Sequence, residues 1–409
     1  DHTFFSVQGT SGAIMTMILT VVGPGDKIIV PRNVHKSIMS AIVFAGAIPI
    51  FIHPELDSEL GISHGISPES VERALLDYPD AKAVLVINPT YFGFVADLQK
   101  IVQIVHNHNI PVIVDEAHGV HIKFHDDLPL SAMQVGADMA ATSVHKLGGS
   151  MTGSSVLNVK EGLVSAKRVQ SILSMITTTS TSYPLLASLD TARRQLAING
   201  YDLLDEAIRL AKDTRKRINS IPHLSCVGRE KLGSSATFDM DPTKLLISVK
   251  DLGITGHEAE EWLRQNANVE VELSDLYNIL CVVTIADTKK EMNLLVNALT
   301  RLSKHFDSEA IVTSVKVTIP EIPALAMTPR DAFYAATESI PLAESEGYIC
   351  AEFIMVYPPG IPIFIPGEII TKENIEYIQM NIQAGLPVQG PEDNTLKNIR
   401  VIKERKAIY

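Results

Sequence analysis

The chain has 409 residues, of which 46% are hydrophobic and 20% are charged, and its formal net charge is −12. This length is enough for two or three domains with buried cores, and the composition is typical of a globular protein. The negative charge argues against nucleic acid as a partner, because such binding needs clustered positive charge, but it suits a small cationic substrate. No run approaches the roughly 20 apolar residues that span a bilayer, so we expect no membrane partner and a cytoplasmic protein.

The cysteines and the first residues of the chain carry two further expectations. Cys226, Cys281 and Cys350 lie far apart and fit no metal-ligand spacing, so we expect buried, reduced thiols and no metal. The chain starts at Asp1 and immediately enters a strand-like run, Phe4–Val7. A domain rarely begins with an uncovered buried strand, and we therefore expect that an N-terminal segment is missing.

The first half of the chain alternates short apolar runs with amphipathic stretches, which is typical of a parallel sheet covered by helices. The predicted strands are Lys27–Val30, Ile48–Ile52, Ala83–Ile87, Pro111–Val114 and Ser154–Val159. The predicted helices between them are Ala13–Val22, Ser37–Phe44 and Asp97–Asn107. A long helical region follows, with apolar residues three and four positions apart in two stretches, Tyr183–Ile198 and Tyr201–Ile218.

A second αβ pattern begins near Cys226. Its predicted strands are Lys244–Val249, Val269–Leu273 and Ile279–Ile285, and its helices begin at the capping box Thr255-Gly-His-Glu258 and at Lys289–Phe306. Beyond it we predict a linker at Ser308–Val317, a Pro-rich segment at Tyr357–Pro362 and a helix at Lys372–Ala384. The chain therefore divides into a large domain over residues 1–225, a small αβ domain over 226–307 and a C-terminal region over 308–409.

The turn Gln8-Gly-Thr-Ser-Gly12 stands between a predicted strand and an apolar helix. Small residues there let backbone N–H groups approach a phosphate, whose charge the helix N-terminus favours. Thr10 and Ser11 can add hydroxyl donors. A plain strand-to-helix turn is an equally good interpretation. The lysine and Ser/Thr of a Walker A loop are absent, so the turn is not a nucleotide-binding P-loop.

Asp115 stands at the end of a predicted buried strand, in Val112-Ile-Val-Asp-Glu-Ala-His-Gly119. α/β proteins bind ligands at the carboxyl ends of such strands, and a carboxylate there can pair with a protonated pyridine nitrogen. The alternative is an acid that caps the following loop. Asp-Glu-Ala-His also spells a helicase motif, but without a Walker A loop that interpretation has no phosphate site. The histidines at 118, 121 and 125 have a spacing that would suit metal ligands on a helix, yet the sequence between them does not favour a helix.

Lys146 ends another predicted strand in apolar company, although lysine is usually exposed. Partial burial lowers the pKa of a lysine and leaves its amine free to attack a carbonyl. Taken alone it would be a surface lysine. With Asp115 in the same domain, and with Ser143 and His145 just before it, we favour a functional lysine. His35, in Arg32-Asn-Val-His-Lys-Ser37, can stack on a flat ring or simply start a helix.

Together these segments resemble the fold-type-I, pyridoxal-phosphate-dependent ornithine/lysine/arginine decarboxylase family, over essentially the whole chain. Within the family the chain looks most like the short bacterial arginine decarboxylases of polyamine biosynthesis. The resemblance implies an α/β large domain with a mainly parallel sheet, a smaller α+β C-terminal region, and a homo-oligomer that is at least a dimer with shared active sites. The segments that carry it are Gly9-Thr-Ser11, Arg32–Ser37, Asp115–Gly119, Ser143–Lys146, Thr177–Tyr183 and Tyr357–Pro362.

The resemblance also implies a role for each site residue. Lys146 would form a Schiff base with the cofactor, and Asp115 would pair with its pyridine nitrogen. His35 would stack on one face of the ring, with Ala117 against the other. Four residues would hold the phosphate: Thr10, Ser11, Ser143 and His145. The segment Thr177, Thr178 and Thr179 would reach the cofactor of the neighbouring subunit.

The reaction so implied is decarboxylation of L-arginine to agmatine and CO2, with Lys146 or His118 returning a proton to the α-carbon; we favour Lys146. The basic side chain of the substrate needs an acidic partner, and the candidates are Glu272, Asp275 and Glu352, each of which can instead be a solvated surface acid. Guanidinium prefers a bidentate carboxylate, whereas an ammonium group needs only a point partner. Lysine and ornithine therefore stay open as substrates. In the transaminase alternative, Arg330 is the candidate for binding the substrate carboxylate.

Overall fold

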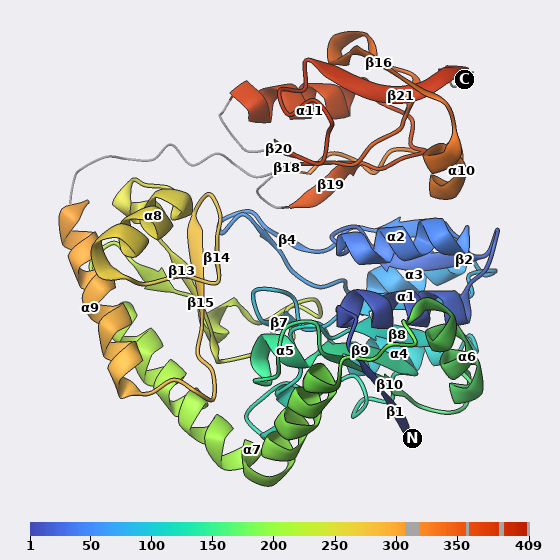
Figure 1. Ribbon diagram of the computed structural model, residues 1–409. Coiled ribbons are helices and arrows are strands. Elements are labelled where there is room, and N and C mark those ends of the chain that lie inside the picture. Colours follow the sequence, from blue (N-terminus) through green and yellow to red (C-terminus); the bar gives the residue numbers. More distant parts are fainter. Residues whose placement is uncertain (307–318, 357–359, 384–387, 407–409) are drawn as a thin grey trace.

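The computed structural model describes residues 1–306, 319–356, 360–383 and 388–406. A seven-stranded sheet with the order β1-β10-β9-β8-β6-β2-β3 forms the centre of the first half (Figure 1). The strands from β9 to β3 are parallel, and β10 runs antiparallel to both of its neighbours. The predicted, mainly parallel sheet is therefore confirmed. Its strands are β1 (His2–Ser6), β2 (Lys27–Pro31), β3 (Ile48–Ile52), β6 (Ala83–Ile87), β8 (Val112–Asp115), β9 (Met139–Ser143) and β10 (Ser155–Val159).

Helices cover both faces of this sheet. Successive strand residues point to opposite faces, so Ile28 and Val30 join one apolar cluster and Ile29 joins the other. The first cluster holds α1 (Gly9–Val21), α2 (Lys36–Ala45) and α6 (Ala166–Ile176), and the second holds α3 (Pro68–Asp77) and α4 (Leu98–His106). Because both faces are buried, the parallel strands β3 and β6 and most of β2 and β8 are apolar, which is why their sequences read as nearly unbroken apolar runs.

The predicted long helical region after α6 is one continuous helix, α7 (Tyr183–Ile218), which includes both predicted stretches. Gly200 lies where this helix approaches a neighbouring segment closely. A Cβ on Gly200 would lie 3.3 Å from the Cβ of Phe124, so the glycine allows α7 to lie close against η1 (Ile122–Phe124).

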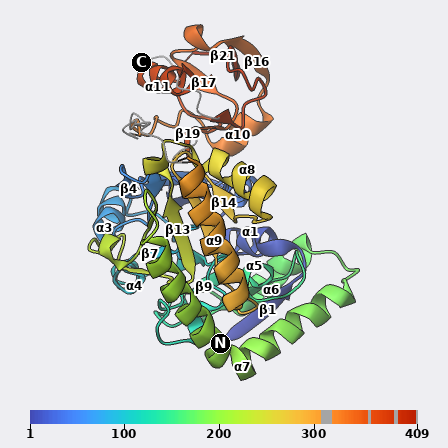
Figure 2. The ribbon, with the colours of Figure 1, turned by 90° about the vertical axis from the view of Figure 1, so that its left-hand side faces the viewer.

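A second, antiparallel sheet has the order β11-β13-β15-β14. Figure 2 shows α9 in orange beside the second half of α7, and residues of both helices share one apolar cluster. The predicted strand Val269–Leu273 is wrong. Asn268 ends α8 in the left-handed conformation, and Val269 packs back on the apolar cluster as a helix-end contact. The elements are β11 (Ser225–Cys226), β13 (Lys244–Ser248), α8 (Gly256–Ala267), β14 (Leu273–Ser274), β15 (Asn278–Val282) and α9 (Lys289–His305).

The C-terminal region, orange to red in Figure 1, contains two three-stranded sheets. The predicted linker Ser308–Val317 and residues 357–359 of the Pro-rich segment lie outside the described residues. The predicted last helix is α11, which ends at Gln383. The elements are α10 (Pro329–Tyr334), β16 (Thr337–Pro341), β17 (Tyr348–Cys350), β18 (Ile354–Val356), β19 (Ile361–Phe364), α11 (Lys372–Gln383), β20 (Val388–Gln389) and β21 (Asn398–Lys406).

The three cysteines are buried and unpaired, as expected. Burial raises the pKa of each thiol, which disfavours the reactive thiolate. Among the described residues, no helix combines the length and apolar character that crossing a membrane would require.

A buried ion pair joins the C-terminal region to the seven-stranded sheet. Arg32 follows β2, and its guanidinium donates to both carboxylate oxygens of Glu368, at 2.6 and 2.8 Å. Both side chains are 1% exposed. The guanidinium also donates to the carbonyl of Pro362 at 2.9 Å and lies 4.5 Å from the ring centre of Phe51. Bidentate geometry and full use of the donors compensate for the loss of water around both charges.

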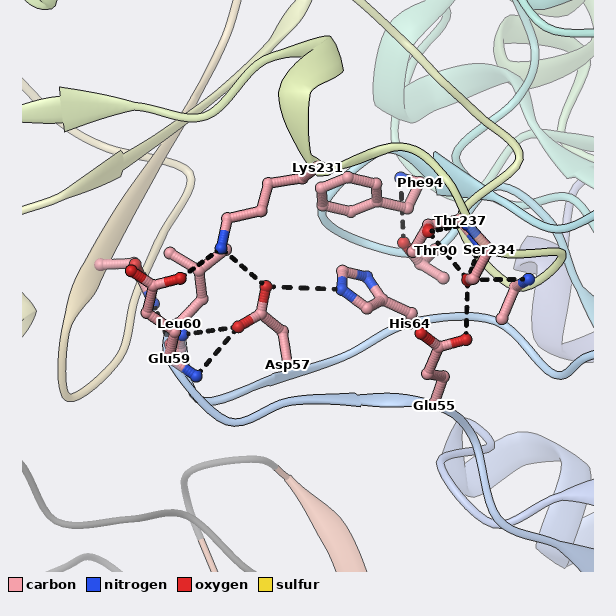
Figure 3. Close-up of polar contacts among 12 residues, drawn as sticks. Glu55, Asp57, Glu59, Leu60, His64, Thr90, Phe94, Lys231, Ser234 and Thr237 are labelled. Atoms are coloured by element: carbon pink, nitrogen blue, oxygen red, sulfur yellow. Dashed lines mark hydrogen bonds and ion pairs between the residues drawn. The ribbon is translucent and has the colours of Figure 1, made fainter.

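A second polar cluster holds the hairpin formed by β4 (Leu56–Asp57) and β5 (Ile62–Ser63) (Figure 3). Asp57 pairs with Lys231 at 3.4 Å and with the buried His64 at 3.8 Å. The His64 ring packs edge-on against Phe94, at 4.5 Å between centres. Phe94 starts β7 (Phe94–Val95), which pairs with β12 (Asp239–Met240). The cluster thereby supports the loop that precedes β7.

Breaking the Arg32–Glu368 pair should destabilise the protein strongly. We expect Glu368→Ala to lower the free energy of unfolding by about 3–5 kcal/mol, because it leaves a guanidinium buried without its counter-charge. The double variant Arg32→Met/Glu368→Leu should lose much less than the two single variants combined. Chemical denaturation measures both. Glu376→Ala, which removes an exposed ion pair in the same region, is the control and should cost at most about 0.5 kcal/mol. A similarly small loss for Glu368→Ala would contradict the assignment.

Candidate active site

The parallel strands bring chemically active side chains together at their carboxyl edge. β8 ends at Asp115, and β9 leads into the short helix α5 (Val144–Leu147), which carries Lys146. His35 follows β2 and caps α2, and Tyr91 lies in the loop after β6. Strand ends that meet at one edge of an open α/β sheet are where such proteins bind ligands.

Asp115 is a buried carboxyl group, 5% exposed. Its side chain accepts one hydrogen bond, from the backbone N–H of Ala117 at 3.1 Å, and no cation in the described part of the chain lies within ion-pair distance. Burial raises the pKa of Asp115 to about 6, and the Ala117 hydrogen bond and the Lys146 charge oppose this rise. A buried carboxyl group in this state attracts a cationic ligand.

The amine of Lys146 lies 2.8 Å from Nε2 of His118. Lys146 is reachable from solvent, yet the surrounding protein removes enough water from its amine to lower the pKa, against the effects of Asp115 and Glu272. His118 is buried, and its pKa falls well below the ordinary value because of burial and the nearby charges of Lys244 and Lys146. At neutral pH the pair therefore combines a neutral imidazole with an amine that loses its proton easily.

Tyr91 connects this pair to a carboxylate. Its ring centre lies 4.4 Å from that of His118 and 5.8 Å from the Lys146 nitrogen. Its hydroxyl donates to Oε1 of Glu272 at 2.7 Å. Glu272 is exposed and thus accessible from the site opening. Of the three acids predicted for the substrate, Glu272 is the one that the structure brings to Lys146.

A buried polar group lies behind His118. The Lys244 amine is 3.5 Å from Nδ1 of His118, and Lys244 is 1% exposed. Asp241, fully buried, accepts from Nε2 of His121 at 2.8 Å and from the hydroxyl of Thr243 at 2.6 Å. The neighbouring charges of His121 and Lys244 hold the pKa of Asp241 below its usual range, against the effect of burial.

The proposed phosphate ligands lie where α1 begins. The Thr10 and Ser143 hydroxyls are buried and hydrogen-bonded to each other, while Ser11 is exposed. Gly9 adopts a positive φ of 71°, which a residue with a side chain would rarely adopt. His145 does not expose both ring nitrogens, because Nδ1 contacts the carbonyl oxygen of Ser154 at 2.8 Å.

His35 and Ala117 come after the carboxyl ends of two parallel strands, β2 and β8. Nδ1 of His35 contacts the Ser37 hydroxyl at 2.7 Å and accepts from the Ser37 backbone N–H at 3.2 Å, so His35 starts a helix. Its ring is exposed, and stacking on a flat ring stays a prediction. Partial burial lowers the pKa of His35, and the charges of Lys146 and Lys36 add to this. A neutral, exposed imidazole can cover a flat ring. Ala117 is half-buried.

The threonine segment after α6 lies beside the start of α1. The side-chain amide of Gln8 is oriented so that its nitrogen and its oxygen both find partners. Its oxygen then accepts from the backbone N–H of Thr178 at 2.8 Å. The Thr177 hydroxyl donates to the Leu173 carbonyl at 2.7 Å. Thr178 and Thr179 are exposed.

Several candidate residues are not brought to this edge. The Asp275 carboxylate accepts from the backbone N–H groups of Tyr277 and Asn278 at 2.9 and 2.8 Å and shapes a turn. Glu352 accepts from two backbone N–H groups in the C-terminal region, and Arg330 donates to the Phe44 carbonyl at 3.4 Å. Their carboxylates and guanidinium bind other partners within the described chain.

The three closely spaced histidines point to different partners. Those of His118 and His121 are described above, and His125 stacks on Tyr201 with 4.5 Å between ring centres. Among the described residues, no group of three or more His, Cys, Asp or Glu side chains is arranged to hold a metal ion.

The residues at this edge fit pyridoxal phosphate. The buried Asp115 carboxyl group awaits a cationic partner, the hydroxyls of Thr10 and Ser143 lie at a helix N-terminus, and Lys146 presents an amine with a lowered pKa. The exposed His35 ring can cover the flat heterocycle. These residues, with Ser11 and Ala117, would hold the cofactor.

Comparisons with known proteins agree with this fit. The model of the Orn/Lys/Arg decarboxylase major domain matches residues 1–291, and that of the Orn/Lys/Arg decarboxylase C-terminal domain matches residues 313–391. The chain belongs to the Orn/Lys/Arg decarboxylase family. It is accordingly a pyridoxal-phosphate-dependent amino-acid decarboxylase with the α/β fold of fold type I, and the family resemblance seen in the sequence is confirmed.

Relatives and solved structures support the family assignment. The arginine decarboxylase of Bacillus subtilis is 68% identical over 409 residues, which cover 100% of this chain and 84% of the relative. That of Bacillus anthracis is 67% identical over 409 residues, 100% of this chain and 83% of the relative. The Francisella novicida lysine decarboxylase LdcF has a TM-score of 0.82 at 22% identity, over 98% of this chain and 70% of that one, which shows a shared fold.

Sequence reasoning missed Tyr91, Lys244 and Asp241. The sequence offered a clue for two of them. Tyr91 follows a predicted strand of the sheet, and Lys244 begins a predicted apolar strand, which is an unusual position for a lysine. Asp241 had no such signal, because only its contact with His121 shows its place in the site.

Glu116, next to Asp115, should make folding stability depend on pH. It is 3% exposed and accepts from the Ala132 backbone N–H at 2.7 Å, and burial raises its pKa to about 7. Because the folded pKa exceeds the ordinary 4.5, this contribution to stability is complete below about pH 4.5 and is lost as the pH rises to about 7.

We expect the difference in unfolding free energy between wild type and Glu116→Gln to change by roughly 2–3 kcal/mol across this window, in favour of the variant at the higher pH. Denaturation at several pH values measures it. The exposed Glu72→Gln is the matched control. Parallel pH curves for wild type and Glu116→Gln would refute a raised pKa.

Proposed function

We propose that this chain decarboxylates L-arginine to agmatine and CO2, as a step of polyamine biosynthesis. One observation carries the proposal: the relatives matched over the full chain at about two-thirds identity are named arginine decarboxylase. The similarity to a lysine decarboxylase structure, at 22% identity, concerns the fold alone. The net charge of −12 also suits a cationic substrate.

The site residues suit this reaction. When bound, pyridoxal phosphate takes up the electron pair that the departing CO2 leaves behind. Lys146 would attach the cofactor, and the buried carboxyl group of Asp115 would pair with the pyridine nitrogen and favour its protonated form. His35 would cover one face of the ring and keep water from that side. His118 exchanges a proton with the amine of Lys146, 2.8 Å away, and Lys146 then returns a proton to the α-carbon of the product.

Glu272 is proposed as the partner of the substrate guanidinium. Tyr91 orients the carboxylate by a 2.7 Å hydrogen bond to Oε1, and the remaining lone pairs of both oxygens can still accept a bidentate pair of N–H groups. An oriented carboxylate suits the planar donors of arginine better than it suits a freely rotating ammonium group. Asp275 and Glu352 are not carried forward in this role, because their carboxylates are held by backbone N–H groups elsewhere.

We further propose a homodimer in the cytoplasm, in which Thr177–Thr179 approaches the cofactor of the partner subunit. Support comes from the exposed apolar side chains on both sides of this segment: Met175 is 82% exposed and Tyr183 is 81% exposed. The first half of α7 also projects at the edge of the molecule (Figure 2). Surfaces of this kind are usually covered by another protein surface. The three buried, unpaired thiols suit a reducing compartment.

Purified protein with added pyridoxal phosphate should release CO2 from arginine, and more slowly or not at all from lysine and ornithine. Lys146→Ala should lower the rate by roughly 10²–10⁴-fold or more, because both the attachment of the cofactor and the proton return depend on this amine. Labelled CO2 and agmatine are measured together.

Preference for lysine or ornithine would keep the decarboxylation and overturn arginine as the substrate. Release that is unchanged in Lys146→Ala would overturn the role of Lys146. Lys212→Ala, which removes a lysine from an exposed ion pair, serves as the control and should behave as wild type.

Glu272→Gln should lower kcat/KM for arginine by roughly 10- to 100-fold, mainly through KM, because a charge-assisted hydrogen bond contributes about 1.5–3 kcal/mol. Steady-state kinetics on arginine measures the change. Glu270→Gln is the matched control, since Glu270 pairs with Arg264 at the surface, at 2.9 Å. Equal effects of both variants would assign the loss to general surface charge.

A further inference from the structure

Lys244 is a buried lysine without a paired carboxylate. It stands at the start of β13 with 1% of its surface exposed, and no carboxylate among the described residues lies within ion-pair distance of its amine. Its one side-chain hydrogen-bond contact is Nδ1 of His118, at 3.5 Å. Removing an ammonium group from water without a paired anion costs several kcal/mol, roughly, so a lysine in such a place calls for a function.

The packing around Lys244 restricts the orientation of its side chain. A Cβ on Gly93 would lie 2.7 Å from Cγ of Lys244, so only glycine fits beside it. The Lys244 nitrogen lies 5.8 Å from the ring centre of Tyr91, the same distance as the Lys146 nitrogen. His118 thus stands between two lysine amines, with one ring nitrogen directed to each.

Donor and acceptor chemistry gives this arrangement a direction. An ammonium group can only donate, so a charged Lys244 makes Nδ1 of His118 the acceptor. A neutral imidazole carries one proton, which must then be on Nε2. Nε2–H donates to the nitrogen of Lys146, and that nitrogen can accept only with a free electron pair. A charged Lys244 therefore favours the unprotonated form of Lys146.

We propose that Lys244 is a positioning residue that acts through His118: its ammonium group holds the imidazole in the Nε2–H form and thereby keeps the nitrogen of Lys146 unprotonated. The inference rests on the proposed function only in assigning Lys146 as the lysine that attaches the cofactor.

Other charged groups also affect the pKa values of the Lys244 and Lys146 amines. Burial lowers the pKa of Lys244, and the charges of Asp241 and Glu272 oppose this fall. Asp241 is itself held by His121 and Thr243. The groups that face Lys146 from the surrounding elements are Asp115, His118, Tyr91, Glu272, Lys244 and His35.

The test compares wild type with Lys244→Met, which keeps an unbranched side chain one atom shorter and removes the charge. In the holoenzyme, the visible absorbance of the bound cofactor is followed against pH. Without Lys244, protonation at the Lys146 nitrogen should become easier, so the midpoint should move to higher pH by about one unit or more. The Lys212→Met control, which loses an exposed lysine, should show the wild-type midpoint.

A second readout does not need the cofactor. The full chain freed of pyridoxal phosphate is labelled with acetic anhydride, which reacts only with unprotonated amines, and labelling of Lys146 is quantified by mass spectrometry across pH. Lys244→Met should move this profile to higher pH as well. If CO2 release fails while both profiles shift, the proposed substrate is wrong and the role of Lys244 stands.

His118→Gln separates action through the imidazole from direct repulsion between the amines. In that background, Lys244→Met should move the midpoint by less than half of its effect in wild type. An equal shift in both backgrounds would overturn the action through His118. A purely structural Lys244 would lower the thermal midpoint of unfolding without moving either pH profile, and that result would overturn the proposal.

Discussion

Charge held away from water at the carboxyl edge of the parallel sheet is the constraint on which this site depends. Asp115 has no paired cation among the described residues and keeps a raised pKa, Asp241 is held by His121, and Lys244 lies beside one ring nitrogen of His118. Burying any one of these ionisable groups by itself costs free energy, and its neighbours reduce that cost. The same burial shifts the pKa values of a carboxyl group and of amines. Groups with such pKa values can exchange protons and bind a charged cofactor near neutral pH.

The parts of the fold farther from this edge keep these groups in place. The Arg32–Glu368 pair joins the C-terminal region to the strand end that also carries His35. The hairpin cluster around Asp57 and His64 supports Phe94 and, through it, the loop that presents Tyr91 (Figure 3). Both contacts join segments far apart in the sequence, so the position of a site residue depends on residues that have no part in the chemistry.

Local patterns predicted most of the large domain. The parallel strands β2, β3, β6 and β8 were predicted because burial on both faces favours unbroken apolar runs. A prediction was wrong where a tertiary contact overrides a local signal: Val269 belongs to a helix end whose apolar contact resembles a strand. Asp115 was found because it ends β8. Lys146 was expected to end a strand, but it lies in α5, three residues after β9.

The sequence by itself determined the family, the mainly parallel α/β fold and the residues proposed to hold the cofactor, because these depend on periodicity and on short segments. Only the tertiary structure decided which acid approaches Lys146, and it brought Glu272 while it placed Asp275 and Glu352 elsewhere. It alone also placed Lys244 behind His118. The physical reason is the same in both cases: an ionisable side chain acquires its role from the charges and hydrogen-bond partners around it, and those come from distant parts of the chain.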